Sequence, residues 1–334
     1  MDVNNKNMPR INYKLAIVCG GTGGHFYPGL SIGRELNING GTAILYLAGK
    51  NAPKQSELTA KFSISNRILP ASASPRSIKG LFFPLLLLRD IIISIFYFIK
   101  DKPDAVLAMG SFNSVAPALA SKILSIPLFI HDGNTRIGKA NIFLSRFAKL
   151  LFLSFPPADA SNIKCPKFEA GMPLRLELIA GKINKLNAIR KINETFSTKL
   201  NPDSPVILVF GGSQGARAIN SSLPNAIADI SKKYKLQVLH LSGQGDKSEI
   251  KKIYDTVAIT NLVINGTEDM ATMYSASDIV VCRAGGSSIA ELSFFAKFAV
   301  LIPFPFASER HQDDNARYFA STGASVIIYE TDLN

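Results

Sequence analysis

Cysteine is scarce in this sequence of 334 residues, which contains only Cys19, Cys165 and Cys282. The three are scattered and show no paired spacing, which argues against a disulfide framework and against a cysteine-based zinc site. A reducing compartment is therefore expected. The first 14 residues are polar and contain no apolar run, so a secretory signal is not expected.

Acidic residues are scarce in the first half of the chain. Residues 1–155 hold 18 Lys and Arg against 7 Asp and Glu, a net charge of +11, whereas the whole chain carries +12. Residues 156–334 hold 19 basic and 18 acidic residues and are nearly neutral. This asymmetry indicates a polyanionic partner for the first half, either nucleic acid or acidic lipid. The length indicates about two domains.

Two common nucleotide-binding signatures are also missing. A strand at 14–19 runs into the glycine-rich loop 20–25, but Phe26 stands where the dinucleotide fingerprint needs its last glycine. The next strand, 42–47, is followed by no acidic residue that could hold a ribose, so NAD binding is not indicated. The loop 211–216 lacks the Lys-Ser/Thr pair of a Walker loop, so nucleoside triphosphate hydrolysis is not indicated.

The sequence does contain a repeated unit of buried strand, glycine-rich turn and helix, at 14–30, 205–216 and 278–300. Such turns point backbone N–H groups and the positive end of a helix at a ligand, and both favour an anion. Glu291 follows the last turn closely enough for its carboxylate to reach sugar hydroxyls. A nucleotide sugar has both a diphosphate and a ribose diol, so these residues favour a nucleotide-sugar site. The alternative interpretation is an ordinary strand-to-helix turn without a ligand.

Further strands at 105–110 and 127–130 bring polar residues to the same sheet edge. The second is followed by His131-Asp132-Gly133-Asn134. Because the carboxyl ends of parallel strands carry the ligand crevice, His25, Asp132 and Asn134 are expected to converge there. The alternative for His25 is that it only caps the helix that Pro28 is expected to open.

The segment 81–100 is the most apolar of the chain, but Arg89 and Asp90 divide it into runs of eight and nine residues. A membrane-spanning helix needs about 20 apolar residues with few charges, so a transmembrane helix is not favoured. Basic residues at 76, 79, 100 and 102 flank the segment and suit a headgroup layer. We therefore expect a core helix whose apolar outer face dips into a membrane surface.

Together these motifs resemble glycosyltransferase family 28, and within it the enzymes that transfer N-acetylglucosamine (GlcNAc) from UDP-GlcNAc to lipid I. The matching motifs follow in order over nearly the whole chain: Gly20-Gly21-Thr22-Gly23-Gly24-His25, Pro28-Gly29-Leu30, His131-Asp132-Gly133-Asn134, Gly171-Met172-Pro173-Leu174-Arg175, Gly211-Gly212-Ser213-Gln214-Gly215-Ala216-Arg217, Asp269-Met270, Cys282-Arg283-Ala284-Gly285, Glu291, His311-Gln312 and Asn315-Ala316. The resemblance implies an α/β chain of the GT-B fold, with two doubly wound Rossmann-like domains facing across a cleft. It implies an N-terminal domain, residues 1–173, that binds the acceptor and the membrane. It also implies a C-terminal domain, residues 174–334, that binds UDP-GlcNAc.

The implied activity is that of an inverting, metal-independent hexosyltransferase of peptidoglycan synthesis. It would move GlcNAc to the C4 hydroxyl of the MurNAc of lipid I and so form lipid II. The implied partners are UDP-GlcNAc, lipid I and the anionic cytoplasmic face of the inner cell membrane, where the protein would be peripheral. No cofactor, metal ion or nucleic acid is expected.

The resemblance also assigns residues by position. Those expected to contact UDP-GlcNAc are Thr22, Gly23, Gly24, Asn134, Arg175, Ser213, Thr267, Gly286, Ser287, Ser288, Glu291, His311 and Gln312. His25 is the expected catalytic base, because a neutral imidazole can accept a proton at cytoplasmic pH. Asp132 is expected either to orient His25 or to serve as the base instead. No carboxylate pair resembles a retaining glycosidase, so a covalent intermediate is not favoured.

Three features depart from the family pattern. Gly133 stands where a polar side chain is usual, and Met172 replaces an asparagine. Family sequences normally continue past the position of Asn334 into helical sequence, so the C-terminal domain is expected to be truncated. The alternatives are a lipid glycosyltransferase with a diacylglycerol acceptor, a UDP-GlcNAc 2-epimerase, and a nucleotide-sugar-binding subunit without a base, although the presence of both halves weighs against the last.

Overall fold

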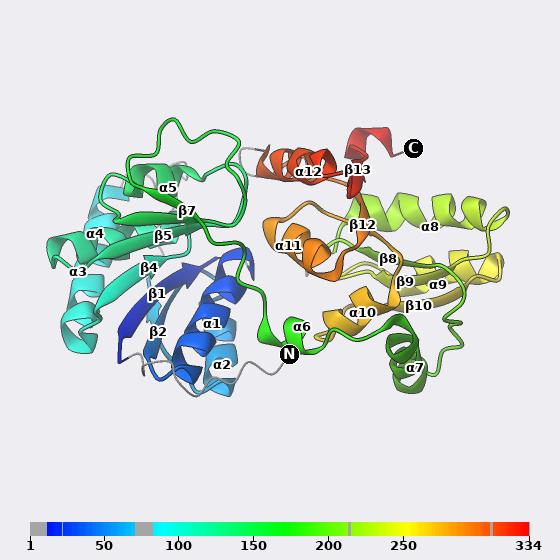
Figure 1. Ribbon diagram of the computed structural model, residues 1–334, viewed down its shortest axis with the longest axis horizontal. Coiled ribbons are helices and arrows are strands. Elements are labelled where there is room, and N and C mark those ends of the chain that lie inside the picture. The colour runs from blue at the N-terminus through cyan, green and yellow to red at the C-terminus, as the bar shows by residue number, and fades with distance from the viewer. Residues whose placement is uncertain (1–11, 22, 71–82, 213–214, 308–309, 334) are drawn as a thin grey trace. The chain divides into compact units, whose positions relative to one another are not determined.

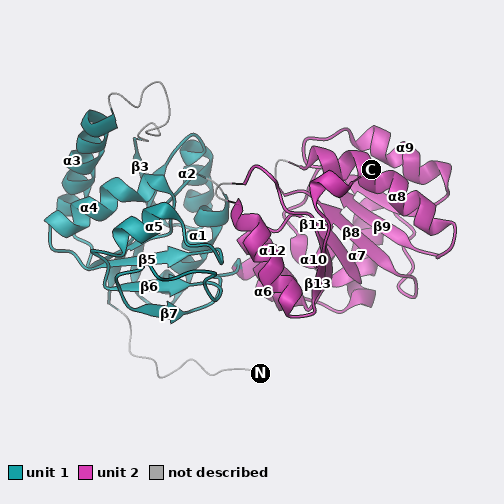
Figure 2. Ribbon diagram, turned by 90° about the horizontal axis from the view of Figure 1, so that it is seen from above, with its two compact units in different colours: residues 1–175 teal, residues 176–334 magenta. Residues whose placement is uncertain are grey.

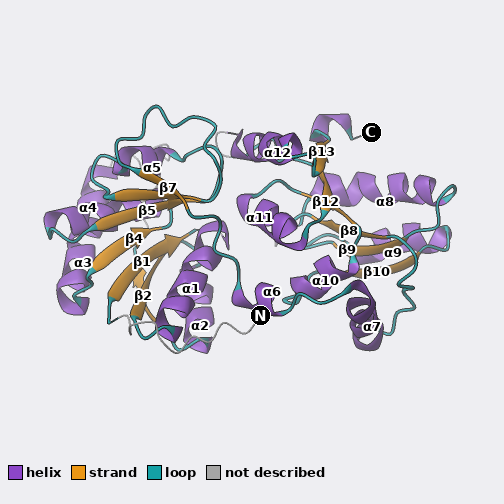
Figure 3. Ribbon diagram, viewed as in Figure 1, coloured by secondary structure: helices purple, strands orange, loops and turns teal. Residues whose placement is uncertain are grey.

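The computed structural model describes residues 12–21, 23–70, 83–212, 215–307 and 310–333 (Figure 1). The chain forms two compact units, residues 1–175 and 176–334 (Figure 2). The division lies two residues beyond the boundary expected from the sequence, so Leu174 and Arg175 belong with the first unit. Each unit is an α/β domain around one parallel sheet (Figure 3).

The first unit contains a seven-stranded sheet in the order β3-β2-β1-β4-β5-β6-β7, with all neighbours parallel. Its strands are β1 Lys14–Gly20, β2 Thr42–Ala48, β3 Ser65–Leu69, β4 Ala105–Ala108, β5 Leu128–Asp132, β6 Leu150–Leu153 and β7 Lys167–Glu169. Its helices are α1 Gly23–Ile38, α2 Ala52–Lys61, α3 Phe83–Asp101, the 3-10 helix η2 Phe112–Ser114, α4 Val115–Ile123 and α5 Lys139–Leu144.

The central strand β1 shows why this sheet is covered on both faces. Ala16 and Val18 belong to a core cluster that includes residues of α3 and α4, whereas Ile17 and Cys19 belong to a second cluster with α1 and α2. Successive side chains of a strand point to opposite faces, so a continuous apolar run needs helices on both sides. The buried strand expected at 14–19 is therefore confirmed as the centre of a doubly wound sheet.

The second unit contains a six-stranded parallel sheet in the order β10-β9-β8-β11-β12-β13. Its strands are β8 Val206–Phe210, β9 Gln237–Leu241, β10 Thr260–Ile264, β11 Ile279–Cys282, β12 Phe298–Leu301 and β13 Ser325–Ile327. Its helices are α6 Leu176–Ala180, α7 Lys185–Phe196, α8 Arg217–Ser231, α9 Lys247–Thr256, α10 Met270–Ala276, α11 Gly286–Phe295, α12 His311–Ser321 and the 3-10 helix η4 Glu330–Asp332.

In both sheets the first strand of the chain lies in the middle. The next strands are added on one side of it, and the later strands on the other side. The direction changes between β1 and β4 in the first unit and between β8 and β11 in the second. Ligands of doubly wound sheets bind beyond the carboxyl ends of the strands at this switch point. The predicted pair of Rossmann-like domains of the GT-B class is confirmed, and each of the three glycine-rich turns follows a strand at a switch point.

Two local expectations are corrected by the structure. Helix α1 begins at Gly23, so Pro28 lies inside the helix rather than opening it. Pro28 is the sixth residue of this helix, so it has no N–H to donate to the carbonyl of Gly24 four residues earlier. The strand expected at 105–110 ends at Ala108, because Gly110 adopts a left-handed backbone with φ +95° that a strand cannot contain.

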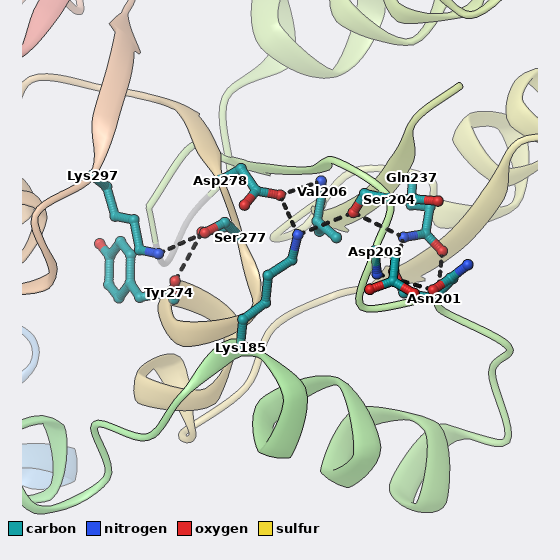
Figure 4. Close-up of polar contacts among 10 residues, drawn as sticks. All are labelled: Lys185, Asn201, Asp203, Ser204, Val206, Gln237, Tyr274, Ser277, Asp278 and Lys297. Atoms are coloured by element: carbon teal, nitrogen blue, oxygen red, sulfur yellow. Dashed lines mark hydrogen bonds and ion pairs between the residues drawn. The ribbon is translucent and has the colours of Figure 1, made fainter. Parts of the chain in front are cut away.

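The amino-terminal edge of the second sheet is tied together by polar contacts (Figure 4). The Asp278 carboxylate, just before β11, accepts hydrogen bonds from the backbone N–H of Val206 at 2.8 Å and from Nζ of Lys185 at 2.8 Å. Lys185 also donates to the carbonyl of Ser204 at 3.1 Å. This network joins α7 to the start of β8 and β11, at the opposite end of those strands from the glycine turns. It therefore stabilises the sheet without occupying the ligand edge.

Candidate functional site

The first glycine loop is shaped by close backbone packing at the end of β1. A Cβ atom on Gly20 would lie 2.5 Å from the carbonyl oxygen of Ala48, so no larger residue fits without movement of the backbone. Gly21 has φ +84° and donates its N–H to the same carbonyl at 2.9 Å. This turn brings α1 directly to the edge of the sheet, with Gly23 and Gly24 exposed in its first turn. Thr22 lies outside the described residues.

Arg175 lies close to this helix start, although 150 residues separate it from His25 in the sequence. Its guanidinium carbon is 5.3 Å from the ring centroid of Tyr27, a distance typical of a cation–π contact. A Cβ atom on Gly23 would lie 3.3 Å from the same ring. The structure therefore brings Gly23 and Arg175 together through Tyr27, which sequence reasoning missed because no local pattern distinguishes it.

His25 packs over the backbone at the end of β4. A Cβ atom on Gly110 would lie 3.1 Å from Cδ2 and 3.2 Å from Nε2 of the His25 ring. His131, at the end of β5, is buried, and its Nε2 lies 3.0 Å from Oγ of Ser154. Burial, and then the nearby charge of His25, lower the pKa of His131 to about 4. His131 is therefore neutral at neutral pH and adds no positive charge beside His25.

Asp132 holds the loop that follows β5. Its carboxylate accepts hydrogen bonds from the backbone N–H groups of Asn134 at 3.1 Å and Gly138 at 2.9 Å. It also accepts one from Nδ2 of Asn141 at 2.9 Å, and Asn141 donates in addition to the carbonyl of His131 at 2.8 Å. Asp132 is only 5% exposed. A buried carboxylate with three donors is well suited to fixing a loop and poorly placed to take a proton from a substrate.

The two departures Gly133 and Met172 lie against each other. A Cβ atom on Gly133 would lie 2.9 Å from Cε of Met172. The thioether sulfur of Met172 is 3.6 Å from Oγ of Ser154, which in turn contacts His131. The methionine therefore occupies the space that a side chain at position 133 would need. The two unusual residues amount to one local repacking rather than two separate losses.

In the second unit, the turn after β8 also requires glycine. Gly212 has φ +88° and Gly215 has φ +76°, conformations that other residues rarely adopt. The Gly215 N–H donates to the carbonyl of Gly212 at 2.9 Å and closes the turn before α8. Ser213 and Gln214 lie outside the described residues, so the structure gives no contact for Ser213.

Helices α8 and α11, which start at the second switch point, differ from α9 and α10 in how their first turns are capped. Helices α9 and α10 start with Asp246 and Asp269, whose carboxylates accept backbone N–H groups of their own first turns. Helices α8 and α11 start after Ala216 and Gly285, and neither start has a side-chain cap among the residues that the structure describes. Helix N-termini have unpaired N–H groups that need an acceptor. The adjacent starts of α8 and α11 can therefore take an anion from outside the protein.

The turn before α11 is held in place by hydrogen bonds from Asn315 and Arg283. Nδ2 of Asn315 donates to the carbonyl of Ala284 at 3.0 Å, and Asn315 is fully buried. Arg283 donates to the carbonyls of Ile302 at 3.1 Å and Pro303 at 3.2 Å and forms a 2.6 Å ion pair with Glu330. The turn therefore does not need a ligand to adopt its conformation.

Glu291 projects from the second turn of α11 and accepts a hydrogen bond from Oη of Tyr274 at 2.9 Å. Gly286, Ser287 and Ser288 form the first turn of the same helix. Oγ of Ser287 is buried and has no hydrogen-bond partner among the described residues. The structure thus brings four of the residues expected to bind the donor onto one helix start.

The other expected donor contacts of this unit lie on neighbouring elements. Oγ1 of Thr267, between β10 and α10, accepts the backbone N–H of Asp269 at 3.0 Å. His311 is the first residue of α12. Oε1 of Gln312 accepts the backbone N–H of Phe304 at 3.0 Å, so its amide nitrogen is the group that could donate to a ligand. Within the described ranges, no group of three or more His, Cys, Asp or Glu is arranged to hold a metal ion.

Comparison with known proteins shows a family relationship over most of the chain. The model of the glycosyltransferase family 28 N-terminal domain matches residues 15–153, and that of the family 28 C-terminal domain matches residues 206–334. A curated relative from Coxiella burnetii is 32% identical over 96% of this chain and 86% of its own length. It is named UDP-N-acetylglucosamine–N-acetylmuramyl-(pentapeptide) pyrophosphoryl-undecaprenol N-acetylglucosamine transferase.

Solved structures agree with this relationship. The crystal structure of MurG from Acinetobacter baumannii matches with a TM-score of 0.75 and 27% identity, over 96% of this chain and 87% of that one. A UDP-GlcNAc 2-epimerase from Neisseria meningitidis, bound to UDP-GlcNAc, matches with a TM-score of 0.63 over 95% of this chain and 87% of that one. Its identity is 16%, so it shares the fold alone.

Proposed function

Because the chain belongs to glycosyltransferase family 28, we propose that it transfers GlcNAc from UDP-GlcNAc to the C4 hydroxyl of the MurNAc of lipid I, forming lipid II. The similarity to relatives named for this transfer covers both units, which supports the assignment of the whole activity. A diacylglycerol acceptor or a 2-epimerase activity is less well supported, since the epimerase shares only the fold.

The observation that carries the donor side of this proposal is the pair of uncapped helix starts at the second switch point. The diphosphate of UDP-GlcNAc binds the N–H groups at the starts of α8 and α11, and Glu291 accepts hydrogen bonds from the ribose hydroxyls. Two helix dipoles and several backbone donors stabilise the charge of the departing UDP. Binding and departure of UDP therefore do not require a bridging metal ion.

In the first unit, His25 acts as the catalytic base. Its imidazole takes the proton of the MurNAc C4 hydroxyl as the oxygen forms a bond to the anomeric carbon of GlcNAc. The bond from that carbon to the diphosphate oxygen breaks with its electron pair on UDP, so a single displacement inverts the anomeric configuration. Asp132 positions the loop that carries Asn134, since its carboxylate is occupied by three donors of that loop and of α5.

Membrane association is proposed for helix α3. Leu85, Leu88, Ile92, Phe96 and Ile99 are 54–67% exposed, and their spacing of three and four residues places them on one face. The buried residues of the helix include Asp90, Ser94 and Asp101. Exposed apolar and buried polar residues reverse the usual arrangement of a helix on a domain surface. No helix within the described ranges is long and apolar enough to cross a membrane. The exposed apolar face of α3 and the proposed lipid acceptor support binding at the surface of the membrane, on its cytoplasmic side.

The acceptor and the membrane surface are tested separately. Protein incubated with UDP-GlcNAc and either lipid I or diacylglycerol is expected to add one N-acetylhexosamine only to lipid I, as measured by mass spectrometry. Flotation with anionic liposomes is expected to recover wild-type protein in a salt-sensitive manner and to lose the variant Phe96→Glu. Ile230→Glu replaces a 46% exposed isoleucine of the second unit and is the matched control. Transfer to diacylglycerol instead, or equal flotation of both variants, would contradict the respective proposal.

A further inference from the structure

We infer that Tyr274 is a positioning residue that orients Glu291 toward the ribose of the donor. The inference rests on the proposed function and deepens it. Oη of Tyr274 donates a 2.9 Å hydrogen bond to Oε2 of Glu291. Tyr274 is fully buried, whereas Glu291 lies near the surface at the end of the sheet. The buried phenol therefore reaches outward to a carboxylate that a ligand can meet.

The Tyr274 ring has little freedom to move. It stacks on Phe295 of α11 with ring centroids 5.0 Å apart and planes at 21°. It also meets Phe210 at the end of β8 edge-on, at 5.9 Å and 87°. Phe295 and Glu291 are four residues apart on the same helix, so one turn of α11 packs on the ring and bonds to its hydroxyl. The phenol consequently fixes both the helix and the carboxylate.

The helix that carries Tyr274 is itself anchored at its start. The Asp269 carboxylate accepts hydrogen bonds from the N–H of Thr272 at 3.1 Å and from its hydroxyl at 2.7 Å, and forms a 2.6 Å ion pair with Lys191. The N–H of Asp269 donates to Oγ1 of Thr267. Helix α10 is therefore anchored beside one proposed donor contact, Thr267, and carries the tyrosine that holds another, Glu291.

This arrangement addresses a specific problem of ribose recognition. A carboxylate that binds a diol must point its oxygens in one direction, but a glutamate side chain near the surface populates several rotamers. A fixed hydrogen bond from a buried donor selects one of them before the ligand arrives, which lowers the entropic cost of binding. The geometry thus assigns to Tyr274 a contribution to specificity for ribonucleotides over 2′-deoxyribonucleotides.

The substitution Tyr274→Phe tests this inference because it removes the hydroxyl and keeps the stacked ring. Calorimetry on the full chain compares UDP with 2′-deoxy-UDP. Wild-type protein is expected to prefer UDP. Tyr274→Phe is expected to weaken UDP binding by about tenfold or more and to weaken binding of 2′-deoxy-UDP, which offers Glu291 only its 3′-hydroxyl, by a clearly smaller factor. The KM for UDP-GlcNAc is expected to rise with kcat nearly constant. In a Glu291→Ala background, Tyr274→Phe is expected to have no further effect on UDP binding.

Tyr254→Phe is the matched control. Tyr254 is also a fully buried tyrosine of the second unit, but its hydroxyl contacts His240 at 2.9 Å rather than Glu291. It is expected to lower the melting temperature without changing the preference for UDP. The inference is wrong if Tyr274→Phe weakens both nucleotides equally, as a packing defect would, or if it keeps the wild-type preference. Wild-type protein that binds neither nucleotide would instead overturn the proposed function, and the inference with it.

Discussion

Acid is expected to destabilise the second unit through a single histidine, His240. This side chain is fully buried in β9, and burial lowers its pKa from 6.5 to about 4. Nε2 lies 3.1 Å from Oδ1 of Asn220 and Nδ1 lies 2.9 Å from Oη of Tyr254. Because an amide oxygen can only accept, Nε2 carries the proton and Nδ1 accepts from the tyrosine. Protonation of Nδ1 turns it from an acceptor into a donor, so the Tyr254 hydroxyl must rotate to accept, and it places a positive charge in a fully buried site.

The sign and size of the effect follow from linkage. The folded state holds His240 neutral, whereas the unfolded state takes up a proton below pH 6.5. The contribution to stability is therefore complete above pH 6.5 and is lost as the pH falls from 6.5 toward 4. A difference of about 2.5 pKa units corresponds to about 3 kcal/mol, a large share of the 5–15 kcal/mol that stabilises a typical domain.

The site is affected as well, because Asn220 also holds the loop beside the donor turn. Its Nδ2 donates to the carbonyl of Ser242 at 2.8 Å, and a Cβ atom on Gly245 would collide with that amide. Protonation keeps the Nε2–H donor to Asn220, so the loop 242–245 loses this support only as the second unit unfolds. Weaker UDP binding is expected in the same pH range as the loss of stability.

The assay uses the absence of tryptophan from the chain. A single Phe294→Trp substitution reports urea unfolding of the second unit, and Phe152→Trp in a separate protein reports that of the first. The variant His240→Gln keeps an acceptor for Tyr254 and a donor for Asn220 but cannot titrate. Between pH 7.5 and 4.5 the second unit of the wild type is expected to lose about 2–3 kcal/mol more than that of His240→Gln. Equal losses in both proteins would show that the buried imidazole does not control the pH dependence.

The remaining predictions concern the site. Glu291→Ala is expected to weaken UDP binding by about 1.5–3 kcal/mol, the range for a hydrogen bond to a charged group, and calorimetry with and without EDTA also tests the proposed independence from metal. His25→Ala is expected to lower kcat by about 10²–10⁴-fold with donor affinity nearly unchanged. Asp132→Ala abolishing turnover while His25→Ala keeps it would identify Asp132 as the base. Gly133→Gln is expected to displace the flexible end of the Met172 side chain and to destabilise the first unit by at most about 1 kcal/mol, and adding Met172→Asn should recover part of the loss. Additive effects of these two substitutions in urea unfolding would show that the residues are independent.

Several features of this protein follow from the sequence by itself. Continuous apolar runs predicted strands of a parallel sheet that is buried on both faces. Glycines after three of these runs predicted tight turns into helices. Both signals are local, because they depend on the side-chain period of a strand and on the backbone freedom of glycine. The strand at 65–69 was missed for the same reason, since its residues Ser65-Asn66-Arg67 show no apolar run and depend on pairing with β2.

Other features depend on contacts between elements that are far apart in the sequence. Tyr274 meets Glu291 across two helices, and Gly133 meets Met172 although 39 residues separate them. The sequence predicted an apolar outer face for the segment 81–100, but only packing decides that Asp90 lies inside and that the stripe of leucine, isoleucine and phenylalanine lies outside. Such side-chain partners depend on how the helices pack on the sheet. The periodicity of a single segment cannot predict that packing.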